Sequence, residues 1–81
     1  MATPTIQPVM VGDSAALSWD AFKYHFKFYL RSIGKDSADV KTRAAILMNC
    51  IGEPMRELMR KWDIPDETYD NVDTLITLID S

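Results

Sequence analysis

The chain has 81 residues, enough for one small domain, and 47% of them are hydrophobic, so a core can form. Its single cysteine, Cys50, excludes an internal disulfide and is typical of a reducing setting, so we expect a cytoplasmic protein. No apolar run approaches the length of a membrane span, so we expect no membrane partner. The net charge of −3 argues against strong nucleic-acid binding, which depends on neutralising phosphates.

The charges are divided unevenly along the chain. The region from Trp19 to Trp62 carries nine basic residues against five acidic ones, whereas the region from Asp63 to Ser81 carries six acidic residues and no base. Opposite patches attract, so this pattern favours head-to-tail association between copies. A solvated surface with no partner also shows such a pattern by chance, and the sequence leaves both interpretations open.

Residues 1–17 predict an extended or flexible N-terminal arm. Pro4 and Pro8 oppose a helix and favour extended backbone. The β-forming residues between and after them allow either a short strand or an arm that lies along the body; they are Ile6, Val9 and Val11. Gly12 and Asp13 are expected to turn the chain into the first helix.

The clearest helix is predicted from Trp19 to Ile33, within a stretch that holds six of the eight aromatic residues. Ser18 is expected to cap its start and Gly34 to end it in the left-handed conformation. Its apolar residues recur at steps of three and four, which indicates one buried face. They are Trp19, Phe22, Phe26, Tyr29, Leu30 and Ile33.

The opposite side of this helix carries two further aromatic residues. Tyr24 and Phe28 are one turn apart and nearly opposite the apolar face, so they are neighbours on the surface. Lys23, Lys27 and Arg31 flank them at four-residue steps. Stray exposed aromatic residues are common, but such a pair also fits a face covered by another chain. We take these five residues as a candidate self-association interface.

Three more helices are predicted over the rest of the chain. The second runs from Asp36, with Asp39 three residues on, to about Ile51, and its wide apolar face makes it the expected central element. The third runs from Pro54 to Trp62, with its inward side chains expected at Met55, Leu58, Met59 and Trp62. Residues 66–68 are expected to form a loop. The fourth helix is expected after Asp70, which would cap it.

These elements predict an all-α fold, a compact bundle of about four helices with an extended N-terminal arm. The helical domain is expected to cover residues 18–81. Because the last helix reaches almost to Ser81 without a tail, we expect the chain to be a fragment of a longer protein.

The sequence offers little material for catalysis. His25 is the only histidine, so neither a Cys/His zinc set nor a His-based triad can be built. Cys50 falls in an apolar helix, where a thiol stays protonated. No glycine-rich phosphate loop and no calcium loop occurs. We therefore expect no enzyme activity, no cofactor and no metal.

One ordered set of residues resembles a known family. Trp19, Phe22, Phe26, Tyr29-Leu30 and Gly34 are followed by a second helix that closes with Leu47, Ile51 and Gly52, and then by Thr68-Tyr69-Asp70 ahead of an apolar helix. Over about residues 17–80 this order resembles the capsid region of Gag polyproteins from gypsy-class LTR retrotransposons. It is also similar to Gag-like proteins of the Arc type that hosts have domesticated.

The resemblance implies the N-terminal lobe of a capsid protein, a non-enzymatic helical module. Such a lobe self-associates with other copies into capsomers and virus-like particles, with a second capsid lobe following in the full-length protein. In the Arc type the lobe also binds a linear peptide, with the extended N-terminal segment beside the groove. Carried onto this sequence, that alternative implies an adaptor for a cellular partner that uses the arm residues Ile6, Val9 and Val11. The residues do not separate an active element from a domesticated one.

Overall fold

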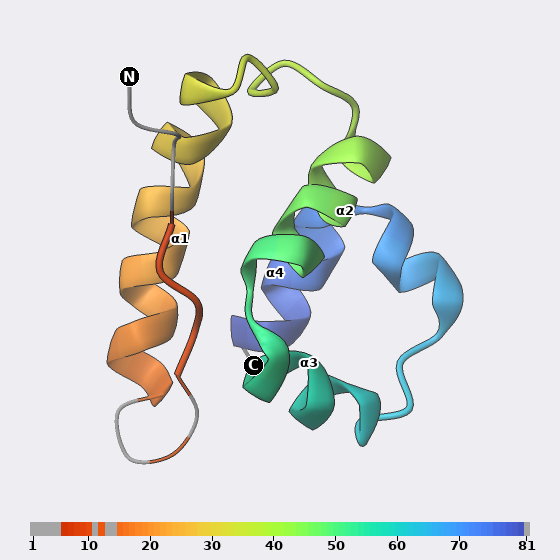
Figure 1. Ribbon diagram of the computed structural model, residues 1–81. Helices are drawn as coiled ribbons and strands as arrows, with labels where there is room; N and C mark the ends of the chain where they lie inside the picture. Colours follow the sequence, from red (N-terminus) through yellow and green to blue (C-terminus); the bar gives the residue numbers. More distant parts are fainter. Residues whose placement is uncertain (1–5, 11, 13–14, 81) are drawn as a thin grey trace.

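The structure, a computed structural model, describes residues 6–10, 12 and 15–80 (Figure 1). Its elements are α1 (Ala15–Ser32), α2 (Val40–Cys50), α3 (Glu53–Arg60), a 3-10 helix η1 (Asp66–Asp70) and α4 (Val72–Asp80). No strand occurs among these residues. The prediction of an all-α bundle of about four helices is therefore confirmed.

Helix α1 ends as predicted but begins earlier. Gly34 has a φ of 73°, and its N–H donates to the Arg31 carbonyl while the Lys35 N–H donates to the Leu30 carbonyl. These two bonds satisfy carbonyl groups that the helix end would leave free. Ser18 lies inside the helix, so its prediction as the N-cap is wrong. Its hydroxyl oxygen instead accepts a hydrogen bond of 2.8 Å from the Met10 N–H.

The segment before α1 lies along the body as an arm. Val9 is buried, and its N–H donates to the Ile51 carbonyl at 2.9 Å. Pro8 packs so closely on Gly52 that a Cβ at that glycine would lie 2.5 Å from the Pro8 Cβ. Figure 1 shows this segment running beside α1. Val11 and Asp13, which the sequence also assigned to the arm and its turn, lie outside the described residues.

Helix α2 packs against both α4 and η1 and supplies the fully buried Ala44 and Leu47. This position agrees with the expectation that it is the central helix. Its cap is Asp39, whose carboxylate accepts from the Thr42 N–H at 2.8 Å, so the helix begins after Asp39 and not at Asp36. Residues 36–38 form turns before it.

The region from α3 to α4 departs most from the predictions. Met55 and Met59 are buried, but Leu58 and Trp62 are 38% and 41% exposed, so their assignment to the core is wrong. The helix has only two turns and ends at Arg60. Its buried side chains are Met55 and Met59, which lie one turn apart on the same face. After that, Asp63 turns the chain with a φ of 54°.

Two further details correct the expected path into α4. The predicted loop at residues 66–68 belongs to η1. The cap of α4 is Asn71 and not Asp70, because the Asn71 side-chain oxygen accepts from the N–H groups of Asp73 and Thr74 at 2.9 and 3.2 Å. An amide oxygen serves this role as well as a carboxylate does.

The buried core joins the arm to all four α-helices. No helix within the described residues is both long enough and apolar enough to cross a membrane. The buried hydrophobic side chains are those of Val9, Trp19, Phe22, Phe26, Leu30, Ala44, Leu47, Ile51, Met55, Met59, Val72 and Leu75.

Candidate functional site

The side of α1 that faces away from the core carries an exposed apolar row, which we call the outer stripe. It consists of Leu17, Tyr24 and Phe28, with 77%, 57% and 44% of their surfaces exposed. Spacings of seven and four residues place all three on one side of the helix. The sequence prediction named Tyr24 and Phe28 but missed Leu17, although the seven-residue step to Tyr24 was a readable signal.

Cations cover the aromatic part of the outer stripe. The Tyr24 and Phe28 rings meet edge to face, with centroids 5.4 Å apart. The Lys27 ammonium lies 5.0 and 5.2 Å from these two centroids, and the Arg31 guanidinium lies 5.5 Å from that of Phe28. The surface that the two rings offer is therefore both apolar and positively charged.

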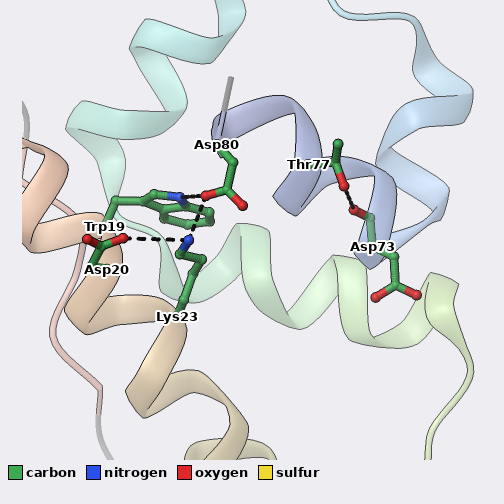
Figure 2. Close-up of polar contacts among 6 residues, drawn as sticks. All are labelled: Trp19, Asp20, Lys23, Asp73, Thr77 and Asp80. Carbon is green, nitrogen blue, oxygen red and sulfur yellow. Dashed lines mark hydrogen bonds and ion pairs between the residues drawn. The ribbon is translucent and has the colours of Figure 1, made fainter.

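Lys23, the remaining predicted member of the interface, lies apart from the two rings. Its ammonium contacts the Asp80 carboxylate at 2.6 Å and Asp20 at 3.6 Å (Figure 2). The same Asp80 oxygen accepts from the Trp19 indole N–H at 2.7 Å. These contacts join α1 to the end of α4. A role for Lys23 between copies stays a prediction.

The Asp80 cluster shifts two protonation equilibria. The hydrogen bond from Lys23, followed by that from Trp19, lowers the pKa of Asp80 below its ordinary value of 3.8. The hydrogen bond to Asp80 in turn raises the pKa of Lys23 above 10.5. Both groups are therefore charged at neutral pH, and the ion pair persists over a wide pH range.

A second exposed apolar region lies at the end of α3. It consists of Leu58 and Trp62, and we call it the Trp62 surface. Trp62 stands between two hollows. One, of about 420 Å³, lies between α1, α3, α4 and the arm and includes Val9, Trp19 and Met55 in its walls. The other, of about 360 Å³, is lined by Trp62, Asp63, Ile64, Pro65, Thr68 and Leu78. Sequence reasoning missed this surface because the helical spacing of Leu58 and Trp62 matched that of core residues.

The arm residues of the candidate peptide site have different surroundings. Ile6 is half-buried, whereas Val9 is 2% exposed and forms part of the core. Val9 also reaches the wall of the larger hollow. Val11 lies outside the described residues. The structure thus places the arm beside the larger hollow, with Val9 as a wall of that hollow.

The remaining groups to consider are candidate metal ligands, the Cys50 thiol and His25. No group of three or more His, Cys, Asp or Glu side chains among them is placed to hold a metal ion. Burial raises the pKa of the Cys50 thiol, which keeps the thiol protonated. His25 is exposed, and its ring meets that of Tyr24 edge to face at 5.5 Å. The two exposed apolar regions are therefore the features from which a function can be argued.

In comparisons with known proteins, no family model, no curated protein and no solved structure matches this chain.

Proposed function

We propose that this chain is a structural module that self-associates through the outer stripe, in the manner of the N-terminal lobe of a Gag-like capsid protein. The observation that carries the proposal is the exposed Tyr24–Phe28 pair, opposite the buried face of α1 and covered by Lys27 and Arg31. Clustered exposed apolar side chains are typical of protein contact sites. Aromatic residues and arginine are also enriched where protein surfaces meet.

The small size of the outer stripe suits an assembly contact. Stable pairs of proteins bury about 800 Å² on each partner, which three side chains and two cations do not supply. A contact repeated over many copies can be weak individually, because each further contact within an assembly forms at high effective concentration. We therefore expect association that depends strongly on protein concentration.

The test is sedimentation velocity of the chain over a wide concentration range, with Tyr24→Ala and Phe28→Ala combined. The wild-type chain is expected to form oligomers as its concentration rises, and the double variant is expected to remain a monomer. Met10→Ala is the matched control, because Met10 is an exposed apolar residue outside α1. Equal association of the wild type and the double variant, or a monomeric wild type at every concentration, would exclude the outer stripe.

The larger hollow favours one alternative, an adaptor lobe that binds a linear peptide of a cellular partner. Its volume of about 420 Å³ and its mainly hydrophobic walls lie beside the arm. This reading expects a monomer that binds apolar or proline-containing peptides saturably in a fluorescence polarisation assay. Ala16→Trp, at an exposed position in the wall, should then abolish binding by filling the hollow. Binding that survives this change would place the peptide elsewhere.

A further inference from the structure

We infer that the outer stripe of one copy docks on the Trp62 surface of a second copy, so that the chains associate head to tail. This inference rests on the proposed function and names the partner surface that the outer stripe meets. Both surfaces expose aromatic and aliphatic side chains, which are 38–77% exposed among the residues that the structure describes. Covering either surface with a second copy therefore removes apolar area from water, which favours association.

The charge balance around the two surfaces is opposite in sign. The exposed bases Arg60 and Lys61 precede Trp62, where Arg60 pairs with Glu57 at 2.7 Å, and the acids after Trp62 outnumber them. The outer stripe is covered by Lys27 and Arg31. The smaller hollow beside Trp62 is built from residues 62–78, and residues 63–80 hold six acids and no base. Asp63 forms part of its wall, and Asp66 and Glu67 follow as exposed residues. Docking the outer stripe here brings cations toward acids around an apolar centre, which is the usual arrangement of a specific interface.

The same charges argue against a symmetric contact. In a two-fold dimer through the outer stripe alone, identical patches would face one another. The Lys27 and Arg31 side chains of the two copies would then approach each other, and like charges at an interface are strongly unfavourable. A contact between two different surfaces avoids this repulsion.

The positions of the two surfaces also allow the contact to repeat. Figure 1 shows α1 along one side of the molecule and α3 near the end at which α1 begins. Trp62 and Ala16 line the same hollow, whereas Tyr24 and Phe28 lie about two turns further along α1, so the two surfaces are separate. Each copy therefore has one surface of each kind, and a copy that uses its outer stripe keeps its Trp62 surface for the next copy. Such contacts form rings when the rotation closes and open chains when it does not.

The decisive experiment mixes two variants that each keep one surface. Tyr24→Ala with Phe28→Ala removes the outer stripe, and Trp62→Ala removes the partner surface. Each variant alone is expected to associate at least tenfold more weakly than the wild type in sedimentation velocity. An equimolar mixture is expected to form a one-to-one dimer that does not grow, because one intact surface of each kind remains.

A charge exchange tests the same contact without changing the apolar residues. Lys27→Glu with Arg31→Glu should weaken association, as should Asp66→Lys with Glu67→Lys, and mixing these two variants should restore it. The matched controls are Lys35→Glu with Lys41→Glu and Asp36→Lys with Glu53→Lys, which make the same charge changes at exposed positions elsewhere. The controls are expected to keep at least half of the wild-type association. The exchanged residues are exposed, so these variants are expected to fold normally. They therefore test the contact even if Trp62→Ala lowers the thermal midpoint of unfolding.

The outcomes separate this inference from the proposed function. If the outer-stripe variant is monomeric while the Trp62→Ala and Asp66→Lys/Glu67→Lys variants associate as the wild type does, the outer stripe meets a different surface and head-to-tail docking is overturned. If the outer-stripe variant associates normally, the proposed function fails, and this inference fails with it. A mixture that forms no dimer also overturns the docking.

Discussion

The two faces of α1 carry similar residues but are placed in opposite environments. On the inner face, Trp19, Phe22 and Phe26 stack in sequence, with ring centroids 5.8 and 5.6 Å apart and planes within 15° of each other. On the outer face, Tyr24 and Phe28 meet nearly perpendicular and remain about half exposed. The inner rings are buried by the rest of the fold, whereas the ring and cation contacts of the outer rings come from residues of their own helix. Aromatic residues at helical spacing thus serve folding on one face and are available for association on the other.

The largest effect is expected from the inner face. Phe26 is 4% exposed, so Phe26→Ala leaves a cavity and should lower the free energy of unfolding by about 3–5 kcal/mol. Urea denaturation followed by circular dichroism measures this loss. In a domain of this size the variant is expected to be largely unfolded at 37 °C. A loss below about 1 kcal/mol would show that the inner face is not tightly packed.

A smaller effect is expected where the arm attaches to α1. Ser18→Ala removes the acceptor of the Met10 N–H and should lower the free energy of unfolding by about 0.5–1.5 kcal/mol. Ser37→Ala is the control, because Ser37 is an exposed serine in the turn before α2. Faster hydrogen exchange at the Met10 amide in the Ser18 variant alone would confirm that this bond holds the arm. Equal exchange in both variants would contradict it.

The Asp80 cluster predicts a dependence on pH. Because the folded state lowers the pKa of Asp80, its contribution is present above the unfolded value near 3.8 and is lost as the pH falls through the lower folded value. Asp80→Asn should therefore lower the melting temperature at neutral pH. Between neutral and acid pH, the melting temperature of the variant should fall less than that of the wild type. Thermal melts between pH 2 and 7 measure this, with Asp70→Asn as the control. A variant whose melting temperature tracks that of the wild type at every pH would exclude the role of Asp80.

The smallest effect on stability is expected from the outer stripe. Tyr24→Ala with Phe28→Ala should lower the free energy of unfolding by less than about 1 kcal/mol, since both rings are about half exposed. The same urea experiment as for Phe26→Ala gives a direct comparison of the two faces. A loss as large as that of Phe26→Ala would mean that the outer stripe supports the fold, and the contrast between the faces would disappear.

The sequence predicted the structure correctly where the local pattern allowed only one interpretation. The apolar spacing of α1 placed Trp19, Phe22, Phe26 and Leu30 in the core, and the freedom of glycine at positive φ placed the end of the helix at Gly34. It failed at helix starts, where several capping residues compete. Ser18 and Asp70 were plausible caps, but the chain used Ser18 to bind the arm and Asn71 to cap α4.

The candidate surfaces were predictable only in part. Tyr24 and Phe28 could be named because their side of α1 is opposite a clear apolar face. Leu58 and Trp62 could not, because their spacing from the buried Met55 and Met59 is that of core residues on one helix face. Which of them stay outside depends on the room that α1, α2 and α4 leave.

By itself, the sequence determined that four α-helices form, that the first stops at Gly34, that charge is divided unevenly and that an aromatic pair lies on the outer side of α1. Each of these follows from local backbone preferences or from side-chain periodicity, which neighbours along the chain settle. Only the tertiary structure decided that Val9 joins the core, that Lys23 pairs with Asp80, and that Trp62 stands exposed between two hollows. Those outcomes depend on which distant segments share one small interior, and residue spacing carries no information about that.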